Sequence, residues 1–518
     1  MNTVRILLVV CAAALVGAGS ARADVSSDFA GHHRQVFRVV VVPGLSIADL
    51  PQLASEGAVG LLVPNAGPDT SQWDAFAGMV RGVLYNTRLP RPKDSVLIHV
   101  QQSADIPSTG PVIVVGLPQG GRTANDRRFP IAVIGHGYHG LLVSSLTRLP
   151  GLVSMADVAR TALQTPHALT WRRDDGAVAS SYRLESQIEV ARTTTMPTSV
   201  LVLSLLVFVA LLLPVGAPAA VGAALLANLA LGWHPTGDTA SRVALVGACT
   251  VAGALVGPRR RLPLGLALVG ILVAYGVTMI VQPWSLALAP IGPELTSRFF
   301  GISNLLETLL LVPALVGARL LKERFGWTAF AVVGALSLAV IAENRLGSDG
   351  GGAIVVGVAF ALLAVRMAGA RPGYAIPALG GAALIVLGLA NLDAASSTPD
   401  HLRGALQGGV TGLMNVAANR VPLAYSRMIE QWWLLIPLFF AVVVALGGAR
   451  YGQSRHARAV VVALVGGLLA SLLVNDSPGP VTIGGLTALF AVEAGVLHRF
   501  LAVPVLRRLV PAKPALEP

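Results

Sequence analysis

Long apolar stretches separated by short polar ones dominate the chain from about Thr198 to its C-terminus. Each stretch approaches the roughly 17 to 25 residues that a helix needs to cross the hydrocarbon core of a membrane. Pro214 and Pro218 leave open whether the first two stretches are two spans or one interrupted span. The pattern predicts an all-α membrane bundle of about eleven helices, at positions 198–214, 218–233, 240–257, 264–283, 299–321, 327–342, 353–370, 374–391, 432–449, 459–474 and 481–497.

The loops between these predicted spans are of two kinds that alternate along the chain. Basic loops lie at 258–261, 322–324 and 455–458, whereas loops rich in Gly, Asn, Asp and Ser include 343–350 and 475–479. Lys and Arg are retained on the cytoplasmic side of a membrane. Eleven crossings then place every strongly basic loop and the C-terminus in the cytoplasm, and the other loops outside. If the first two stretches formed one span, this assignment would be inverted.

The residues before the first span have the character of a folded α/β domain with a sheet and flanking helices. Short β-branched runs bounded by Gly or Pro predict buried strands, and the segments between them suit helices. The predicted strands are 37–42, 96–100, 111–115 and 131–134, and the predicted helices are 47–55, 71–85 and 154–164. We therefore expect an extracytoplasmic domain at 24–196, a transmembrane domain at 197–498 and a basic cytoplasmic tail at 499–518.

The first 23 residues are typical of a signal peptide. Arg5 precedes an apolar run, and the sequence Ala21-Arg22-Ala23 has the small residues of a cleavage site. The alternative is an uncleaved anchor, and in both cases Asp24 and the residues after it are delivered outside. Of the two cysteines, Cys11 lies in this peptide and Cys249 in a span, so the mature chain has no pair for an internal disulfide.

Composition supports a plasma-membrane location and argues against a nucleic-acid partner. In 518 residues, 54% are apolar and 12% charged, which is far more hydrophobic than a soluble protein. The formal charge is +12, but the arginines are dispersed at span ends, without the basic stripe with interleaved aromatic residues that nucleic-acid binding needs. The expected partners are membrane lipids, and no cofactor is predicted.

Four loops on the predicted outer side carry the residues with most chemical interest. Glu307 lies inside a span, where an ionisable group is costly and by default faces a cavity or a partner; the alternative is a hydrogen-bonded group between helices. The triplet Gly350-Gly351-Gly352 lets backbone N–H groups approach an anion, although it is equally compatible with a tight turn. The candidate ligand-binding residues are Arg298, Asn304, Glu307, Arg345, Asp349, His401, Arg403, Asn475 and Asp476.

The last two of these loops also have simpler interpretations. The segment 391–431 predicts an amphipathic surface helix, and Trp432 with Trp433 suits an interfacial aromatic belt. Asn475 and Asp476 precede Pro478 and are ordinary turn formers. Because all four loops share a predicted side, we nevertheless formulate the hypothesis of one outward site, built from Glu307, Asp349, His401, Arg403 and Asp476.

The N-terminal domain resembles a shortened member of the alkaline phosphatase superfamily. The resemblance rests on the segment 39–50, on Leu53-Ala54-Ser55-Glu56-Gly57-Ala58, on Val63-Pro64-Asn65 followed by Thr70-Ser71, and on the late segment 151–161. It covers about 150 residues. The architecture, with the sequences "R-F-F-G-I-S-N" and "G-S-D-G-G-G", also resembles a group of actinobacterial-type membrane proteins without an assigned activity.

The resemblance to the phosphatases implies a nucleophile at Thr70 or Ser71, but the metal ligands that would activate it are missing. Pro43 stands where the superfamily has a metal-binding Asp, and no Asp-His pair occurs between Asp24 and Met196. Two histidines, His136 and His139, do not hold a two-metal site. No metal site is therefore predicted. The expected role of Thr70 and Ser71 is to cap the following helix, and the domain is expected to be a pseudoenzyme.

Four functions remain open from the sequence. The first is handling of a lipid-linked glycan or phosphate, or of another anionic cell-envelope ligand, at the outer face. The second is a transporter or flippase that uses Glu307. The third is an extracytoplasmic hydrolase or phosphotransferase. A purely structural partner is a fourth alternative.

Overall fold

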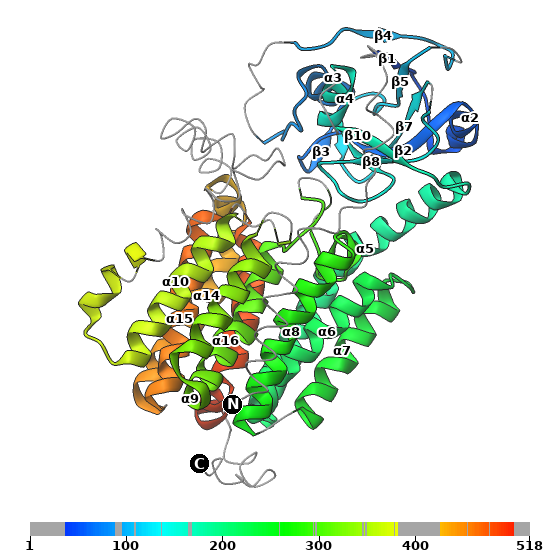
Figure 1. Ribbon diagram of the computed structural model, residues 1–518. Helices are drawn as coiled ribbons and strands as arrows, with labels where there is room; N and C mark the ends of the chain where they lie inside the picture. The colour runs from blue at the N-terminus through cyan, green and yellow to red at the C-terminus, as the bar shows by residue number, and fades with distance from the viewer. Residues whose placement is uncertain are drawn as a thin grey trace. The chain divides into compact units, whose positions relative to one another are not determined.

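The computed structural model describes two compact units, shown in Figure 1. The first contains the residues up to Arg192 together with Pro293–Phe300, and the second contains Thr193–Gly292 and the residues from Gly301 on. The described residues are 37–88, 96–107, 110–135, 137–163, 168–257, 260–293, 295, 298–343, 346–347, 350–377, 379–381, 425–452, 454–475 and 477–501.

The first unit is an α/β fold around a mixed sheet with the strand order β10-β8-β2-β7-β5-β1-β4, in which β9 also pairs with β2. β1 is parallel to β4 and β5, whereas β7 is antiparallel to both β5 and β2. The strands are β1 Arg38–Val41, β2 Gly57–Val63, β4 Val100–Gln102, β5 Val112–Val115, β7 Phe129–Ile134, β8 Gly140–Ser144, β9 Leu152–Ser154 and β10 Leu169–Arg172, and a small separate sheet pairs β3 Asp69–Thr70 with β6 Thr123–Ala124.

Helices cover both faces of the main sheet, which explains why its central strands are apolar throughout. On one face, Met79 of α3 (Gln72–Arg81) and Val158 of α4 (Met155–Ala162) join the same core cluster as Val39 and Ile113. On the other, α2 (Leu50–Glu56), which follows the short helix η2 (Ile47–Asp49), packs against β2 and β7. This arrangement confirms the α/β character expected for the N-terminal part.

This sheet differs from the sequence prediction in several details. The strands β8, β9 and β10 were not predicted. The apolar run 96–100 predicts a strand, but β4 begins only at Val100, and Val96 and Leu97 are 56% and 48% exposed. The central strand β2 was not predicted, because Gly57 and Gly60 interrupt its apolar pattern. A Cβ at Gly57 would overlap the backbone carbonyl of Val133 in the neighbouring strand. These glycines therefore permit a close approach that local propensity does not reveal.

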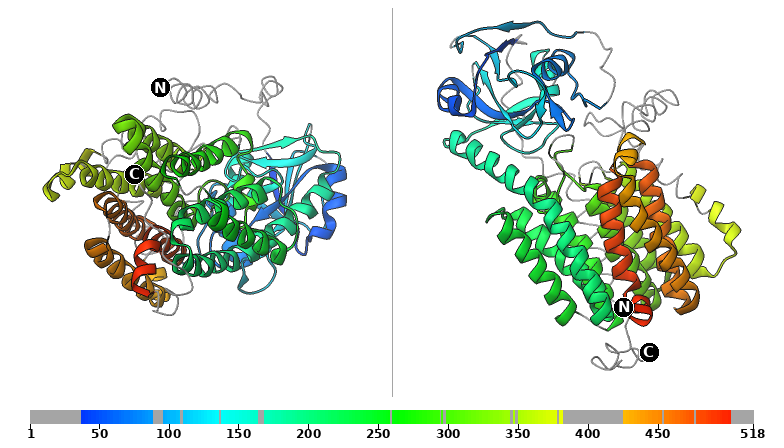
Figure 2. Two further views of the ribbon diagram at one scale, coloured as in Figure 1. Left: turned by 90° about the horizontal axis from the view of Figure 1, so that it is seen from below. Right: turned by 180° about the vertical axis from the view of Figure 1, so that it is seen from behind.

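The second unit is a bundle of long helices (Figure 2). Seven described helices are long and apolar enough to cross a membrane, so the count of eleven crossings remains a prediction. The expected span 374–391 lies mostly outside the described residues. The helices are α5 Ala177–Leu212, α6 Ala217–Trp233, α7 Thr239–Val256, α8 Arg261–Val281, α9 Asn304–Ala342, α10 Gly350–Ala368, α14 Trp432–Gly452, α15 Arg455–Val474 and α16 Pro478–Leu501, with short turns η3 Pro214–Gly216, η4 Ser285–Leu288 and η5 Pro372–Tyr374. The residues of α5 up to Arg192 belong to the first unit.

The predicted spans 299–321 and 327–342 both fall in α9, which folds back on itself. Its 39 residues would extend about 58 Å if straight, yet Ile302 N and Gly347 O, just beyond its two ends, are 2.9 Å apart. The chain reverses at Gly326, whose φ of 77° is left-handed. Such a conformation favours glycine because it has no Cβ. α9 is therefore a helical hairpin with two antiparallel arms.

The ambiguous first pair of spans consists of separate helices. η3 interrupts the chain between α5 and α6. A Cβ at Gly216 would overlap the backbone of Ala254, so the start of α6 lies beside the end of α7. Leu201 of α5 lies against Gly247 of α7, farther from that end. α5 and α6 therefore run in opposite directions.

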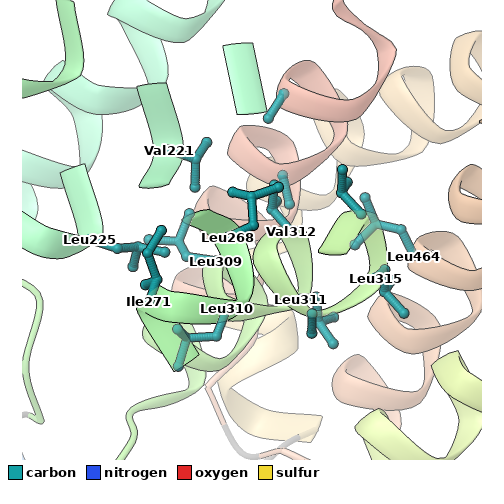
Figure 3. Packing of buried hydrophobic residues seen from close by; sticks show 14 of the residues in the cluster. Val221, Leu225, Leu268, Ile271, Leu309, Leu310, Leu311, Val312, Leu315 and Leu464 are labelled. Carbon is teal, nitrogen blue, oxygen red and sulfur yellow. The ribbon is translucent and has the colours of Figure 1, made fainter. Parts of the chain in front are cut away.

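Apolar packing at the centre of the bundle joins helices that are distant in sequence (Figure 3). Leu225 of α6, Ile271 of α8, Leu309 of α9 and Leu464 of α15 are each at most 4% exposed and belong to one core cluster. This packing brings the two kinds of loop to opposite ends of the bundle.

The basic loops meet at one end, which we call the basic end. Glu323 lies at the turn of the α9 hairpin. Its Oε1 is 3.3 Å from Arg319 Nε and 3.5 Å from His456 Nδ1 at the start of α15, and its Oε2 is 3.6 Å from Arg261 Nη1 at the start of α8. A Cβ at Gly369, just after α10, would overlap Arg455. The loops rich in Gly, Asn and Ser lie at the opposite end, which we call the polar end.

Candidate functional site

Glu307 lies in the first turn of α9, at the polar end of the bundle. Ser303 caps this helix, because its Oγ accepts a hydrogen bond from Leu306 N at 3.2 Å. The Glu307 side chain is fully buried. A carboxyl group near a helix N-terminus is favoured by the helix dipole, which offsets part of the cost of burying it.

Asn475 is the partner that brings a second predicted outward loop to Glu307. It follows α15 directly and is 4% exposed. Its Nδ2 donates to Glu307 Oε2 at 2.9 Å and to Ser471 Oγ at 2.8 Å. Glu307 is therefore a hydrogen-bonded group between helices, which was one of the two interpretations of this residue from the sequence. Its partner Asn475 lies 168 residues away in the sequence.

The glycine-rich loop before α10 also lies against Asn475. A Cβ at Gly351, in the first turn of α10, would overlap Asn475 Oδ1, so only a glycine lets α10 approach this closely. On the other side, Ile302 N donates to Gly347 O at 2.9 Å. The loops before α9, before α10 and after α15 are therefore in direct contact.

The end of the fourth loop, immediately before α14, completes the arrangement. Arg427 Nη1 donates to Ser477 Oγ at 3.0 Å, and Gly479 N donates to Gln431 Oε1 at 3.0 Å. Trp432 and Trp433 follow and are 61% and 56% exposed. All four predicted outward segments thus contribute described residues to one end of the bundle, which the sequence alone did not establish.

Not every predicted residue is part of this contact set. Asn304 is the half-buried first residue of α9. Arg298 belongs to the first unit, where Leu295 N donates to its carbonyl at 3.0 Å. The other candidates, and the amphipathic helix expected within 391–431, lie outside the described residues; these candidates are Arg345, Asp349, His401, Arg403 and Asp476.

A second polar cluster near this end was not predicted. Asn228 of α6 is fully buried and holds the loop after η4, because its Oδ1 accepts from Ile291 N at 2.6 Å. Its Nδ2 lies 3.2 Å from the Tyr275 hydroxyl of α8, which donates to Leu225 O at 3.0 Å. We call this the η4 clamp. The signal that would have found it is a lone Asn within an apolar span.

Arg242 of α7 is the charged member of the η4 clamp. It is 1% exposed, and its guanidinium donates to Leu288 O and to Thr236 O, each at 3.1 Å. A second missed residue is Glu493 in α16, an acid that is only 3% exposed and lies in the predicted span 481–497. Both are ionisable residues in apolar helices, which by themselves mark candidate sites.

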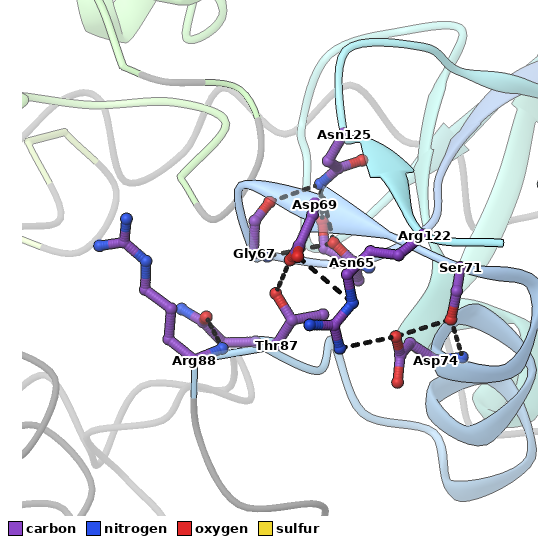
Figure 4. Close-up of polar contacts among 10 residues, drawn as sticks. Asn65, Gly67, Asp69, Ser71, Asp74, Thr87, Arg88, Arg122 and Asn125 are labelled. Carbon is purple, nitrogen blue, oxygen red and sulfur yellow. Dashed lines mark hydrogen bonds and ion pairs between the residues drawn. The ribbon is translucent and has the colours of Figure 1, made fainter.

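The proposed nucleophile positions follow β2 in the first unit (Figure 4). Ser71 is the N-cap of α3: its Oγ accepts from Asp74 N at 3.1 Å and donates to Asp74 Oδ2 at 2.7 Å. Thr70 is 2% exposed and lies in β3. Ser71 therefore caps α3 by accepting a hydrogen bond from a backbone N–H in the first turn of the helix. Thr70 is enclosed in the small sheet.

The rest of this loop is held together by polar contacts between its side chains. Arg122 bridges Asp69 at 3.3 Å and Asp74 at 3.7 Å, and Asp69 also accepts from the Thr87 hydroxyl. Asn125 Nδ2 donates to Asn65 O at 2.8 Å. Within the part of the chain that the structure describes, no group of three or more His, Cys, Asp or Glu is placed to hold a metal ion.

One titratable group in the first unit is strongly perturbed. Asp157 of α4 is fully buried, and its burial raises the pKa of the carboxyl to about 7, although a hydrogen bond from Ser144 opposes this shift. The contact ties α4 to the end of β8. Asp157 is far in sequence from Thr70 and Ser71, and its chemistry is that of a buried structural acid that titrates near neutrality.

Comparison with known proteins gives no family for this chain. No family model matches it, and neither a curated protein nor a solved structure is significantly similar.

Proposed function

We propose that this chain is a multi-pass membrane protein whose polar end faces outward and binds a lipid-linked or otherwise anionic ligand of the cell envelope. The observation that carries the proposal is the meeting of four separate loops around the Glu307–Asn475 pair. Loops that only connect helices have no need of a buried acid, because its burial costs free energy. An assembled polar end of this kind suits recognition.

The orientation rests on charge. Arg261, Arg319 and His456 gather around the single carboxylate of Glu323 at the basic end, which leaves an excess of positive charge there. Such an end is retained in the cytoplasm. Exposed tryptophans at the two ends, Trp327 at the basic end and Trp433 at the polar end, suit the two interfaces of a membrane.

Labelling of single cysteines on intact cells tests the orientation. The double substitution Cys11→Ser, Cys249→Ser provides the background. Gly350→Cys and Gly373→Cys form a matched pair, because both glycines are exposed and have open space where a Cβ would be. A membrane-impermeant maleimide should modify position 350 at the polar end and leave position 373, beyond α10, unmodified until the cells are opened. The reverse pattern would invert the proposed orientation.

Complementation tests the site. Glu307→Gln and Asn475→Ala each remove the buried hydrogen bond and should fail to restore envelope integrity in a strain that lacks the protein. Ser337→Ala is the matched control, since Ser337 is equally buried in α9 but bonds only to its own helix, at Val333 O. Membrane levels of all variants are measured by immunoblot. Full complementation by both site variants would refute the ligand site.

A second candidate function is transport, which the complete burial of Glu307 within a span-length helix favours. Acids in this position recur in ion and proton pathways. In that case, uptake or lipid scrambling in proteoliposomes depends on Glu307 and is lost in Glu307→Gln but not in Ser337→Ala. Absence of any flux in the wild-type protein would remove this candidate.

We also infer that the first unit is a degenerate, non-catalytic relative of the alkaline phosphatase superfamily. The strand–loop–helix order from β2 to α3, with Ser71 at the helix start, supports this inference. Aryl phosphates with Zn²⁺ or Mn²⁺ provide the test. Metal-dependent hydrolysis that disappears in a Thr70→Ala, Ser71→Ala double variant would show that the unit is an enzyme.

A further inference from the structure

The η4 clamp holds an arginine whose charge is not neutralised by the described part of the chain. Arg242 is 1% exposed and uses its N–H groups on two backbone carbonyls, Thr236 O and Leu288 O. A guanidinium has five N–H donors, so three of them have no acceptor among the described residues. Two neutral carbonyls orient the group, but they do not supply the negative charge that a buried cation requires.

The acidic residue nearest to Arg242 along the helix, Asp238, caps the helix and forms no ion pair with it. Asp238 is the N-cap of α7, one turn before Arg242, and its Oδ1 accepts from both Ser241 N and Ser241 Oγ at 2.8 Å. Its carboxylate therefore completes the helix start. No described carboxylate forms an ion pair with Arg242.

A second unsatisfied group lies on the segment that Arg242 contacts. Ser285 opens η4, is fully buried, and its Oγ has no hydrogen-bond partner within the described part of the chain. Leu288, whose carbonyl binds Arg242, ends the same turn. Three residues of such a helix rise about 6 Å, so Ser285 lies within one turn of the carbonyl that holds Arg242.

We propose that Arg242 and Ser285 form a subsite for a phosphate or phosphate-ester group at the polar end of the bundle. Arginine suits this ligand because its planar N–H groups pair with two phosphate oxygens at once. The Ser285 hydroxyl donates to a third oxygen. The proposal deepens the proposed function, on which it rests, by naming the chemical class and the residues that recognise it.

The irregular backbone around this subsite agrees with a binding role. The loop from η4 to Ile291 is non-helical and buried, and Asn228 clamps it to the helices. Within a membrane protein, non-helical backbone is tolerated where it is enclosed by protein or lines a polar cavity. Broken segments of this kind commonly form the ligand sites of membrane proteins.

Binding to the purified full-length protein tests the subsite. The protein is purified in a neutral maltoside detergent, which contains no phosphate, and is titrated with inorganic phosphate; a second titration uses mixed micelles that contain phosphatidylglycerol. Ligand binding is read as a rise in the unfolding temperature, since a ligand at 100 times its Kd shifts the folding equilibrium about 100-fold. Stabilisation by inorganic phosphate identifies a free anion as sufficient, whereas stabilisation only by phosphatidylglycerol identifies a lipid headgroup.

Ser285→Ala is the decisive variant. Its hydroxyl has no partner among the described residues, so its removal leaves the ligand-free protein as stable as the wild type or more stable, while the affinity for the stabilising phosphate source falls about three- to tenfold. Arg242→Gln should lower the affinity at least about tenfold, and Arg242→Lys, which keeps the charge but not the fork, should lower it less. Arg261→Gln at the basic end is the matched control and should bind as the wild type does.

Two results would overturn the subsite. One is a wild-type protein that neither phosphate source stabilises. The other is unchanged binding in both Ser285→Ala and Arg242→Lys, which would leave Arg242 as a purely structural residue even if Arg242→Gln fails to fold. These outcomes do not depend on complementation or on orientation, so the subsite and the proposed function can fail separately.

Discussion

Gly351→Ala is the sharpest test of the contact on which the candidate site depends. A Cβ at this position would overlap Asn475 Oδ1 and come within 3.4 Å of Val474 Cγ2. Asn475 would have to leave its place, and with it the hydrogen bonds to Glu307 Oε2 and Ser471 Oγ. Gly350→Ala is the matched control, because the same Cβ one residue earlier meets nothing within 4 Å.

The expected magnitudes follow from these contacts. Overpacking costs about 1–3 kcal/mol, partly offset by about 1 kcal/mol because Ala is a better helix former than Gly. Asn475→Ala alone leaves buried polar groups without their partner and costs about 1–3 kcal/mol. In the double variant Asn475 Oδ1 is gone, so the methyl group introduced by Gly351→Ala fits, and the loss should be close to that of Asn475→Ala alone. The two substitutions are therefore non-additive by the net cost of Gly351→Ala, which is up to about 2 kcal/mol.

Cys249 makes the measurement possible in the full-length protein. It is a free, half-buried cysteine of α7 in the second unit, so in a Cys11→Ser background a thiol-reactive dye reports when this unit opens on heating. Gly351→Ala should lower the unfolding temperature by a few degrees, and Gly350→Ala should leave it unchanged or raise it. Additive effects of Gly351→Ala and Asn475→Ala would show that the two loops do not touch, and would refute the convergence of the polar end.

Three further predictions address other parts of the chain. Burial raises the pKa of Asp157 to about 7, so the folded state holds a proton that the unfolded chain releases near pH 4. The free energy of unfolding of the first unit should therefore fall by up to about 4 kcal/mol as the pH rises from about 4 to 7. Hydrogen exchange in α4 should show this fall in the wild type but not in Asp157→Asn. Gly326→Ala should cost about 1–3 kcal/mol although the space is open, because φ 77° with ψ −166° is a conformation that almost only glycine adopts. Gly270→Ala in α8, where the space is also open and φ is not positive, should leave the stability unchanged or raise it, and equal unfolding temperatures for the two variants would contradict this. Ser71→Ala removes the cap of α3 and should cost about 1 kcal/mol, measured by urea unfolding, whereas no change in the midpoint would mean that the cap contributes nothing.

Helical spans were predictable from the sequence because apolar periodicity and length are local properties. The expected stretches 218–233 and 240–257 agree with α6 and α7 to within about a residue. In the first unit, the apolar runs of β1, β5 and β7 were likewise visible. β2 was not, because its glycines interrupt the apolar pattern. Gly57 is required by the close backbone of the neighbouring strand, which the sequence of β2 does not show.

The candidate site was predictable only in part. Glu307 was identifiable because a charge in an apolar helix is costly, but its partner Asn475 had the pattern of an ordinary turn. The sequence also did not indicate that Arg242 and Ser285 belong together. Arg242 is conspicuous as a charged residue in an apolar helix, but Ser285 is an ordinary residue in a separate segment of the chain. Their relation is a property of packing between α7 and η4.

The sequence by itself determined that the chain has long apolar helices, that basic and polar loops alternate between them, and that an α/β region precedes them, because these features depend on composition and spacing alone. Only the tertiary structure decided that α9 turns back at Gly326, that four polar loops meet at Glu307 and Asn475, and that Arg242 is buried without a counter-ion among the described residues. The physical reason is that hydrogen bonds and close backbone contacts between distant segments depend on how helices pack. No local pattern in the sequence records that packing.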